Sequence, residues 1–196
     1  ELYKEVIREY ANSGQVKKEA NVSAKKEKEC RTYVFLSAGG GRGASTVSEA
    51  FARRCAKQGN VLKLDLQFCS GMETSVKNLD DILFALKSRR YILPLKLEAD
   101  VRISEDGVAT FGICENPIDL LHVSREEMRQ LLKAIEESGD YNTIIIDMDG
   151  IFGEKEREIL CCADRIVCVA DESRECVNKF QRLYQAILAL QQLEKQ

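Results

Sequence analysis

The feature that most restricts the fold is a pair of strand-like segments whose apolar centres are uninterrupted. The segments are YNTIIIDMD at residues 141–149 and RIVCVAD at residues 165–171. A strand with one face in water alternates apolar and polar residues, whereas a strand covered on both faces is apolar throughout, which is typical of parallel sheets. The two segments therefore predict a parallel sheet with both faces covered by other elements.

Strand and helix patterns alternate along the rest of the chain. The expected strands lie at residues 32–38, 61–66, 143–147 and 165–169, and the expected helices at 45–59, 79–86, 154–164, 173–196 and from residue 124 onward. Such alternation implies right-handed crossovers between parallel strands. We therefore expect an α/β fold, a three-layer sandwich with a mainly parallel sheet. Gly59 is the expected C-terminal cap of the first helix, and residues 89–100 show no regular pattern.

Two local signals are more specific. Ser124 and Glu127 have the spacing of a capping box, and the helix that they begin has a buried stripe. That stripe consists of Met128, Leu131, Leu132 and Ile135. The segment VRISEDGVATFGI at residues 101–113 predicts a hairpin with its turn at Asp106-Gly107. This hairpin is either an extension of the sheet edge or a partner-binding element.

A glycine-rich loop separates the first expected strand from its helix. In SAGGGRGAST, four glycines fall within residues 39–43, directly before Ser45 and Thr46. Glycines allow backbone N–H groups to converge on a phosphate, and the N-terminus of the following helix adds partial positive charge. The Ser45 hydroxyl lies in the first helical turn, where a phosphate-binding loop supplies a magnesium ligand. The loop therefore predicts a phosphate site.

Two acids follow other strands of the predicted sheet. Asp65 ends the run VLKLD and Asp147 ends TIIID. Ligands of an open parallel sheet bind beyond the carboxyl ends of the strands. We therefore expect Ser45, Asp65 and Asp147 to lie together as a magnesium site, with Asp65 as the one candidate for a catalytic role. Lys63 lies two residues before Asp65 and is expected to point elsewhere.

The loop resembles, without gaps, the deviant Walker A loop of the ParA/MinD superfamily, whose pattern is S-G-K-G-G-x-G-K-[ST]-[ST]. VLKLDLQ is similar to the second acidic strand of that family, and YNTIIIDMDG to its Walker B segment. The resemblance covers residues 32 to about 190. It implies a P-loop NTPase fold of MinD/ParA-like topology with ATP and Mg²⁺ as cofactors. The nucleotide-binding residues that it implies are Gly39, Gly40, Gly41, Arg42, Gly43, Ala44, Ser45 and Thr46.

Within that superfamily the chain is most similar to the CpaE/TadZ branch of pilus-assembly and polar-localisation proteins, through DDILFALKSRR and ENPIDLLHVSREEMRQLL. Members carry a receiver-like domain joined by a linker to an ATPase-like domain. The resemblance implies that residues 1–31 are the tail helix of a missing receiver-like domain plus a linker, and that residues 32–196 are the nucleotide-binding domain. The first residue is Glu1 rather than Met, which we interpret as a piece of a longer protein. An expression remnant or a frayed terminus is the alternative for residues 1–29.

The chain departs from the family pattern at three places. Ala44 stands where the family has the lysine that bridges the β- and γ-phosphates, and Gly39 stands where a second lysine reaches the phosphates of a dimer partner. Leu66-Gln67 replaces a frequent second acid. Each lost transition-state contact commonly costs ~3 kcal/mol, or ~100-fold in rate. We therefore expect weak or absent hydrolysis but retained binding. Arg42 either substitutes for a lysine or is an ordinary solvated arginine.

Three functions remain open on these residues. The first is an ATP-binding, weakly or non-hydrolysing switch or scaffold, dimeric when loaded, that positions a pilus or secretion assembly. The second is an active Mg-dependent ATPase of the partitioning type that uses Arg42 as its cation. The third is a nucleotide-free interaction module.

Composition restricts the classes of partner that the chain is expected to bind. The formal net charge is −3, so no basic field favours a specific nucleic acid. No apolar run approaches the ~20 residues of a membrane span, which leaves only peripheral association through partners. The eight cysteines form no C-x-x-C pair and His122 is the single histidine. We interpret the cysteines as reduced, mostly buried thiols of a cytoplasmic protein.

Overall fold

The computed structural model describes residues 30–71, 79–88 and 92–193. The tail helix and linker expected within residues 1–29 lie outside the described residues. The elements are β1 (Arg31–Ser37), α2 (Ala44–Ala56), β2 (Val61–Asp65), α3 (Leu79–Ser88), α4 (Leu93–Asp100), β3 (Arg102–Ile103), β4 (Val108–Thr110), α5 (Pro117–Leu121), α6 (Arg125–Ser138), β5 (Thr143–Asp147), α7 (Glu154–Cys162), β6 (Arg165–Val169) and α8 (Arg174–Leu193).

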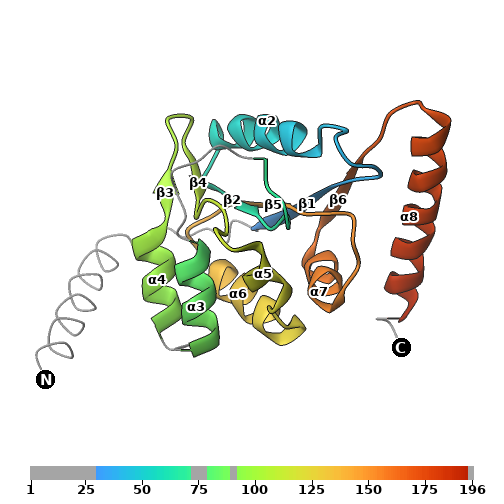
Figure 1. The fold of residues 1–196 in the computed structure, drawn as a ribbon. Helices are drawn as coiled ribbons and strands as arrows, with labels where there is room; N and C mark the ends of the chain where they lie inside the picture. Colours follow the sequence, from blue (N-terminus) through green and yellow to red (C-terminus); the bar gives the residue numbers. More distant parts are fainter. Residues whose placement is uncertain (1–29, 72–78, 89–91, 194–196) are drawn as a thin grey trace, which may run out of the picture.

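The described strands form a six-stranded sheet in the order β3-β4-β2-β5-β1-β6. Within this order, each pair of neighbours in the series β4, β2, β5, β1 and β6 is parallel. The edge strand β3 pairs with β4 in the antiparallel direction. Figure 1 shows α2 on one face of this sheet, α3 to α7 on the other, and α8 beside the β6 edge. The predicted α/β sandwich with a mainly parallel sheet is therefore confirmed.

Alternate residues of the strands supply the cores on the two faces. The larger core takes Leu62 and Ile144 from β2 and β5, together with side chains of α3 to α7. The smaller core lies under α2 and takes Val61 and Ile145 from the same two strands. Because successive strand residues point to opposite faces, Asp65 belongs to the α2 face, as does Asp147. The sheet therefore presents both acids to α2 rather than to the helices on the other face.

Two features of the predicted elements are confirmed in detail. The Ser124 hydroxyl accepts from the Glu127 N–H at 3.2 Å, while Glu127 Oε2 accepts from the Ser124 N–H at 2.8 Å. The four predicted stripe residues of α6 are all buried. The hairpin β3–β4 turns at Gly107 and forms the edge of the sheet, which agrees with an edge extension.

Three local predictions are wrong. Strand β6 is partly exposed rather than buried, because it lies at the sheet edge with β1 on one side. Helix α4 occupies part of the stretch that showed no pattern, with Pro94 in its first turn, where proline fits a helix. Helix α2 ends at Ala56 with Lys57 as its cap. Gly59 instead permits close packing, since a Cβ there would lie 2.6 Å from Asn142 Oδ1.

The cysteines are free thiols, as expected, but most of them are not buried. Only Cys114 and Cys176 are buried, and Cys69, Cys161 and Cys162 are exposed. Burial, with a hydrogen bond to Asp80, raises the pKa of Cys114 to about 12. Among the described residues, none of the helices combines the length and the apolar character that a membrane crossing requires.

Candidate functional site

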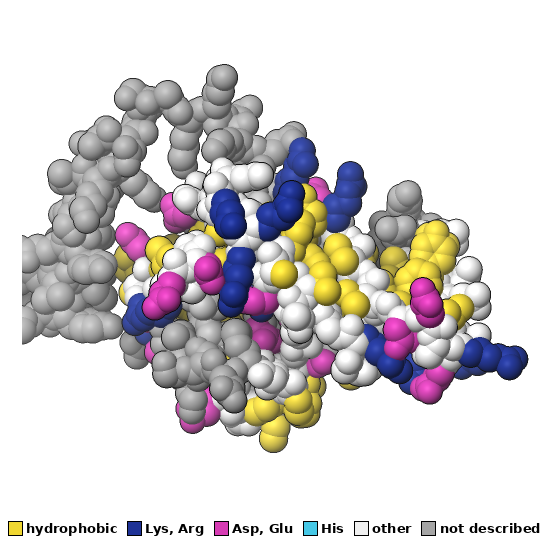
Figure 2. All heavy atoms as spheres, turned by 90° about the horizontal axis from the view of Figure 1, so that it is seen from above, with side chains coloured by type: hydrophobic (Ala, Val, Ile, Leu, Met, Phe, Trp, Pro, Cys, Tyr) yellow, Lys and Arg dark blue, Asp and Glu magenta, His cyan; other side chains and the backbone are white. Residues whose placement is uncertain are grey.

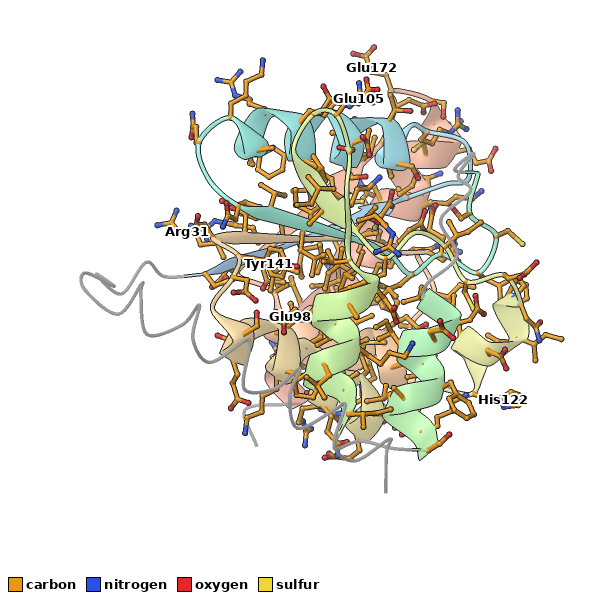
Figure 3. All side chains as sticks on the ribbon, turned by 90° about the vertical axis from the view of Figure 1, so that its left-hand side faces the viewer. Arg31, Glu98, Glu105, His122, Tyr141 and Glu172 are labelled. Atoms are coloured by element: carbon orange, nitrogen blue, oxygen red, sulfur yellow. The ribbon has the colours of Figure 1, made fainter. Side chains whose placement is uncertain are left out.

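The glycine loop follows the carboxyl end of β1 and leads directly into α2. Figure 3 shows Arg31 and Tyr141 at the opposite end of the sheet, where β1 and β5 begin. Gly41 and Gly43 have φ values of 71° and 87°, in the left-handed region that favours glycine. When successive residues alternate between the right-handed and left-handed helical conformations, their N–H groups converge and form an anion-binding concavity. The backbone thus has the conformation expected of the phosphate loop.

The space in front of this loop is open. A Cβ built on Gly40, Gly41 or Gly43 would meet no atom within 4 Å. Helix α2 has no side-chain cap at Gly43 and no acidic residue in its first turn. Within the described part of the chain, no group accepts a hydrogen bond from the N–H groups of residues 40–46. The helix N-terminus therefore presents unused donors and partial positive charge, which suits an anion.

Asp65 and Asp147 lie next to each other at the carboxyl ends of β2 and β5, as register partners in the parallel ladder. Asp147 is fully buried, and the Ser48 hydroxyl lies 2.9 Å from its Oδ2. That hydroxyl also lies 2.9 Å from the Ser45 carbonyl, so its single proton serves one acceptor at a time. Asp147 Oδ1 is buried and has no hydrogen-bond partner among the described residues. Ser48 thus ties the second acid to α2, and one carboxylate oxygen stays available.

Asp65 is held differently, because both of its oxygens accept hydrogen bonds nearby. The Gln67 N–H donates to Oδ1 at 3.1 Å, and the Ser70 hydroxyl donates to Oδ2 at 2.5 Å. The Ser45 hydroxyl donates to Gln67 Oε1 at 3.1 Å. Gln67 therefore connects the first turn of α2 to the end of β2. Its role was not evident from the sequence, where it appeared only as the replacement of an acid.

Burial controls the charge state of both acids. It raises the pKa of Asp147, against the lowering effect of the Ser48 and Ser45 hydroxyls. It also raises the pKa of Asp65, against the hydrogen bonds from Ser70 and Gln67. The charge of Lys63 lowers both pKa values to a smaller extent. A bound cation would favour the ionised form of each acid in the same way.

The two basic side chains that the sequence singled out are both paired. Lys63 is buried, and its Nζ lies 2.9 Å from Glu49 Oε2 of α2. It therefore points to α2. The Arg42 guanidinium forms an ion pair with Asp171, which lies in the turn between β6 and α8. Arg42 is thus an exposed arginine that has an ion-pair partner.

The residues fit a magnesium ion that arrives with a nucleotide. Within the described ranges, no group of three or more His, Cys, Asp or Glu side chains is arranged to hold a metal ion. Mg²⁺ at such sites takes most of its ligands from phosphates and water, with one or two protein groups. The Ser45 hydroxyl and the free oxygen of Asp147 are groups of this kind. Asp65 remains a predicted ligand whose oxygens already accept from Gln67 and Ser70.

Comparison with known proteins agrees with the fold. No protein-family model matches the chain, and no curated protein matches it. A ParA family ATPase from Chlorobium tepidum is similar in structure, with a TM-score of 0.65 and 19% identity over 82% of this chain and 68% of that one. A putative plasmid partition protein from Borrelia burgdorferi, bound to AMPPNP, has a TM-score of 0.59 and 15% identity, over 82% of this chain and 70% of that one. The kinase domain of VpsO has a TM-score of 0.62 and 18% identity, over 95% of this chain and 92% of that one.

These TM-scores establish a shared fold. The predicted P-loop NTPase topology of the ParA/MinD type is therefore confirmed.

Proposed function

We propose that this protein binds ATP with Mg²⁺ at the glycine loop and acts as a nucleotide-dependent switch or scaffold. One observation carries the proposal: among the described residues, the N–H donors at the start of α2 have no acceptor, and the buried Oδ1 of Asp147 nearby has no hydrogen-bond partner. The donors would bind phosphate oxygens, and the Asp147 carboxylate would accept a hydrogen bond from metal-bound water or coordinate the ion itself. The ion would supply positive charge that offsets the charge of the phosphates. The AMPPNP bound to one structural relative supports an adenine nucleotide.

Hydrolysis is proposed to be weak or absent. Gly39 and Ala44 provide no cation at the two family lysine positions, and the Arg42 guanidinium is paired with Asp171. Phosphoryl transfer depends mainly on electrostatic stabilisation of the transition state. A partitioning-type ATPase that relies on Arg42 is therefore less well supported. In that case, phosphate release above background would disappear in Arg42→Ala.

The finer proposal is a CpaE/TadZ-like role, in which an ATP-loaded dimer in the cytoplasm positions a pilus or secretion assembly. Support comes from the sequence similarity of residues 80–90 and 115–132 to that branch. Helices α3 and α5 and the start of α6 occupy the described part of these segments. Size-exclusion chromatography with light scattering tests the dimer, which is expected with AMPPNP and Mg²⁺ but not without nucleotide.

Calorimetry with ATP and Mg²⁺ tests the binding proposal, with two glycine variants as a matched pair. Gly43 and Gly107 have similar φ values of 87° and 80°, so a valine strains the backbone comparably at either position. Gly43→Val is expected to abolish binding, because it changes the loop. Gly107→Val changes only the β3–β4 turn and is expected to bind normally. Absence of binding by the unmodified protein at millimolar ATP would leave a nucleotide-free interaction module.

A further inference from the structure

A second basic side chain reaches the glycine loop from a distant part of the sequence. Lys179 belongs to α8, and its Cδ lies 3.9 Å from the position of a Cβ built on Gly39. The Arg42 Nε lies 3.7 Å from the same position. Both distances are ordinary van der Waals contacts. The lysine stem therefore passes through the space beside Gly39, where a side chain at that position would begin.

The sheet explains why α8 comes to this position. Strand β6 pairs with β1, and the Ala38 N–H donates to the Val169 carbonyl at 3.1 Å where the two strands end. The turn that follows β6 carries Glu172 in Figure 3 and lies on the α2 side of the sheet. The first turns of α8 therefore begin close to the glycine loop. Figure 2 shows side chains of both charges together at the α8 end of the molecule.

The two cations beside the loop are paired with anions that differ in their other hydrogen bonds and in their exposure. Asp171, the partner of Arg42, also accepts from the Ser173 N–H at 3.0 Å and from its hydroxyl at 2.6 Å. That pair therefore attaches the loop to the turn between β6 and α8.

Lys179 pairs with Glu175 at 2.5 Å on the surface of α8, where their side chains are 53% and 70% exposed. Exposed pairs one helical turn apart contribute little to stability. The Lys179 pair is thus the more exposed of the two, since the Arg42 and Asp171 side chains are 35% and 40% exposed, and Lys179 can exchange its partner for a phosphate at small cost.

We propose that Lys179 is the residue that neutralises the polyphosphate bound at the glycine loop, and that Arg42 stays with Asp171 and holds the loop in place. This inference rests on the proposed nucleotide function. A lysine has a flexible four-carbon stem and three donors, which suits a group that must move from Glu175 to a phosphate. Gly39 leaves room for that stem. The missing lysines of the loop are thus replaced by one from α8.

Calorimetry of the full chain with Mg·ATP and with Mg·tripolyphosphate tests this assignment. Lys179→Ala is expected to lower the affinity for both ligands about 10-fold to 100-fold, which is the range expected for a lost hydrogen bond to a charged group. Equal losses are expected because the contact is to phosphate and not to the base. Lys179→Arg should restore most of the affinity, and Lys179→Gln should not, although it keeps a long polar stem.

The matched control is Lys133→Ala. Lys133 forms an exposed ion pair one turn from Glu137, at 3.6 Å, on α6, which lies on the other face of the sheet (Figure 1). The variant removes the same charge and is expected to keep the affinity of the unmodified protein. If Lys179→Ala also binds as tightly as the unmodified protein, the assignment is wrong while the proposed function stands. If the unmodified protein binds neither ligand, the proposed nucleotide function is wrong, and the assignment of Lys179 is wrong with it.

Discussion

The buried carboxylate of Asp147 is expected to destabilise the protein when no ligand is bound. The residue is fully buried, and its Oδ1 has no partner in the described part of the chain. Asp65 lies beside it in the ladder, and its charge also raises the pKa of Asp147. Asp147→Asn removes the buried charge at nearly constant shape. Ser48 can still donate to the remaining carbonyl oxygen.

An unsatisfied buried polar group costs about 1–3 kcal/mol, and more when it is charged. The amide of the variant is itself a buried donor, so part of the gain is lost again. We therefore expect Asp147→Asn to raise the free energy of unfolding of the ligand-free protein by about 1–2 kcal/mol. In a protein of this size 1 kcal/mol corresponds to about 2–4 °C, so the melting temperature should rise by about 2–8 °C.

The effect should depend on pH with a definite sign. The ordinary pKa of Asp147 is 3.8, and burial raises it in the folded protein. Because the pKa of Asp147 is raised in the folded protein, its protonation stabilises the folded state below pH 3.8. This stabilisation is lost as the pH rises through the pKa that Asp147 has in the folded protein. The advantage of Asp147→Asn should therefore be absent at and below pH 3.8 and should grow as the pH rises through the folded pKa of Asp147.

Thermal unfolding followed by circular dichroism at several pH values, with and without Mg·ATP, measures all of these effects. Mg·ATP is expected to stabilise the unmodified protein more than Asp147→Asn, because the variant lacks the carboxylate that the ion favours. A ligand-free variant that is less stable than the unmodified protein at neutral pH would refute the reasoning. A pH-independent difference between the two proteins would refute it as well.

Three further predictions concern packing, capping and thiol chemistry. Gly150→Ala should lower the free energy of unfolding by about 1–3 kcal/mol, measured by thermal melting, because a Cβ there would lie 2.9 Å from the Ser37 carbonyl oxygen. Ser124→Ala should cost about 0.5–2 kcal/mol in urea unfolding, through loss of the α6 cap. Cys69 is exposed and should react with a disulfide reagent at pH near 8, whereas Cys114, with a pKa of about 12, should react only after unfolding.

The sequence was most informative where one strand or helix determines its own environment. The apolar centre of β5 predicted a position inside a parallel sheet, and the structure places it between β2 and β1. Because Asp65 and Asp147 each end a strand, their proximity could be expected from parallel pairing alone. The glycines of the loop predicted converging N–H groups, and the left-handed φ values of Gly41 and Gly43 agree with that prediction.

The sequence was least informative where the contact depends on how separate elements pack. The pairing of Arg42 with Asp171 joins residues 129 positions apart, and no local pattern marks it. Gln67 and Lys179 reach the loop because β2 and α8 begin or end beside it. Ser48 was within reach of sequence reasoning, since it lies one helical turn after Ser45. The exposure of β6 was missed because its composition does not reveal whether it has a second neighbour.

The side-by-side placement of Asp65 and Asp147 separates the rigid from the movable part of the molecule. The two carboxylates are tied by the hydrogen bonds of β2 and β5, and a strand can shift its register only by whole residues, which would turn its core side chains outward. Helix α8 carries no such restraint, since most of its described side chains are exposed. A change of shape that accompanies ligand binding is therefore expected at α8, with the acids as its fixed reference.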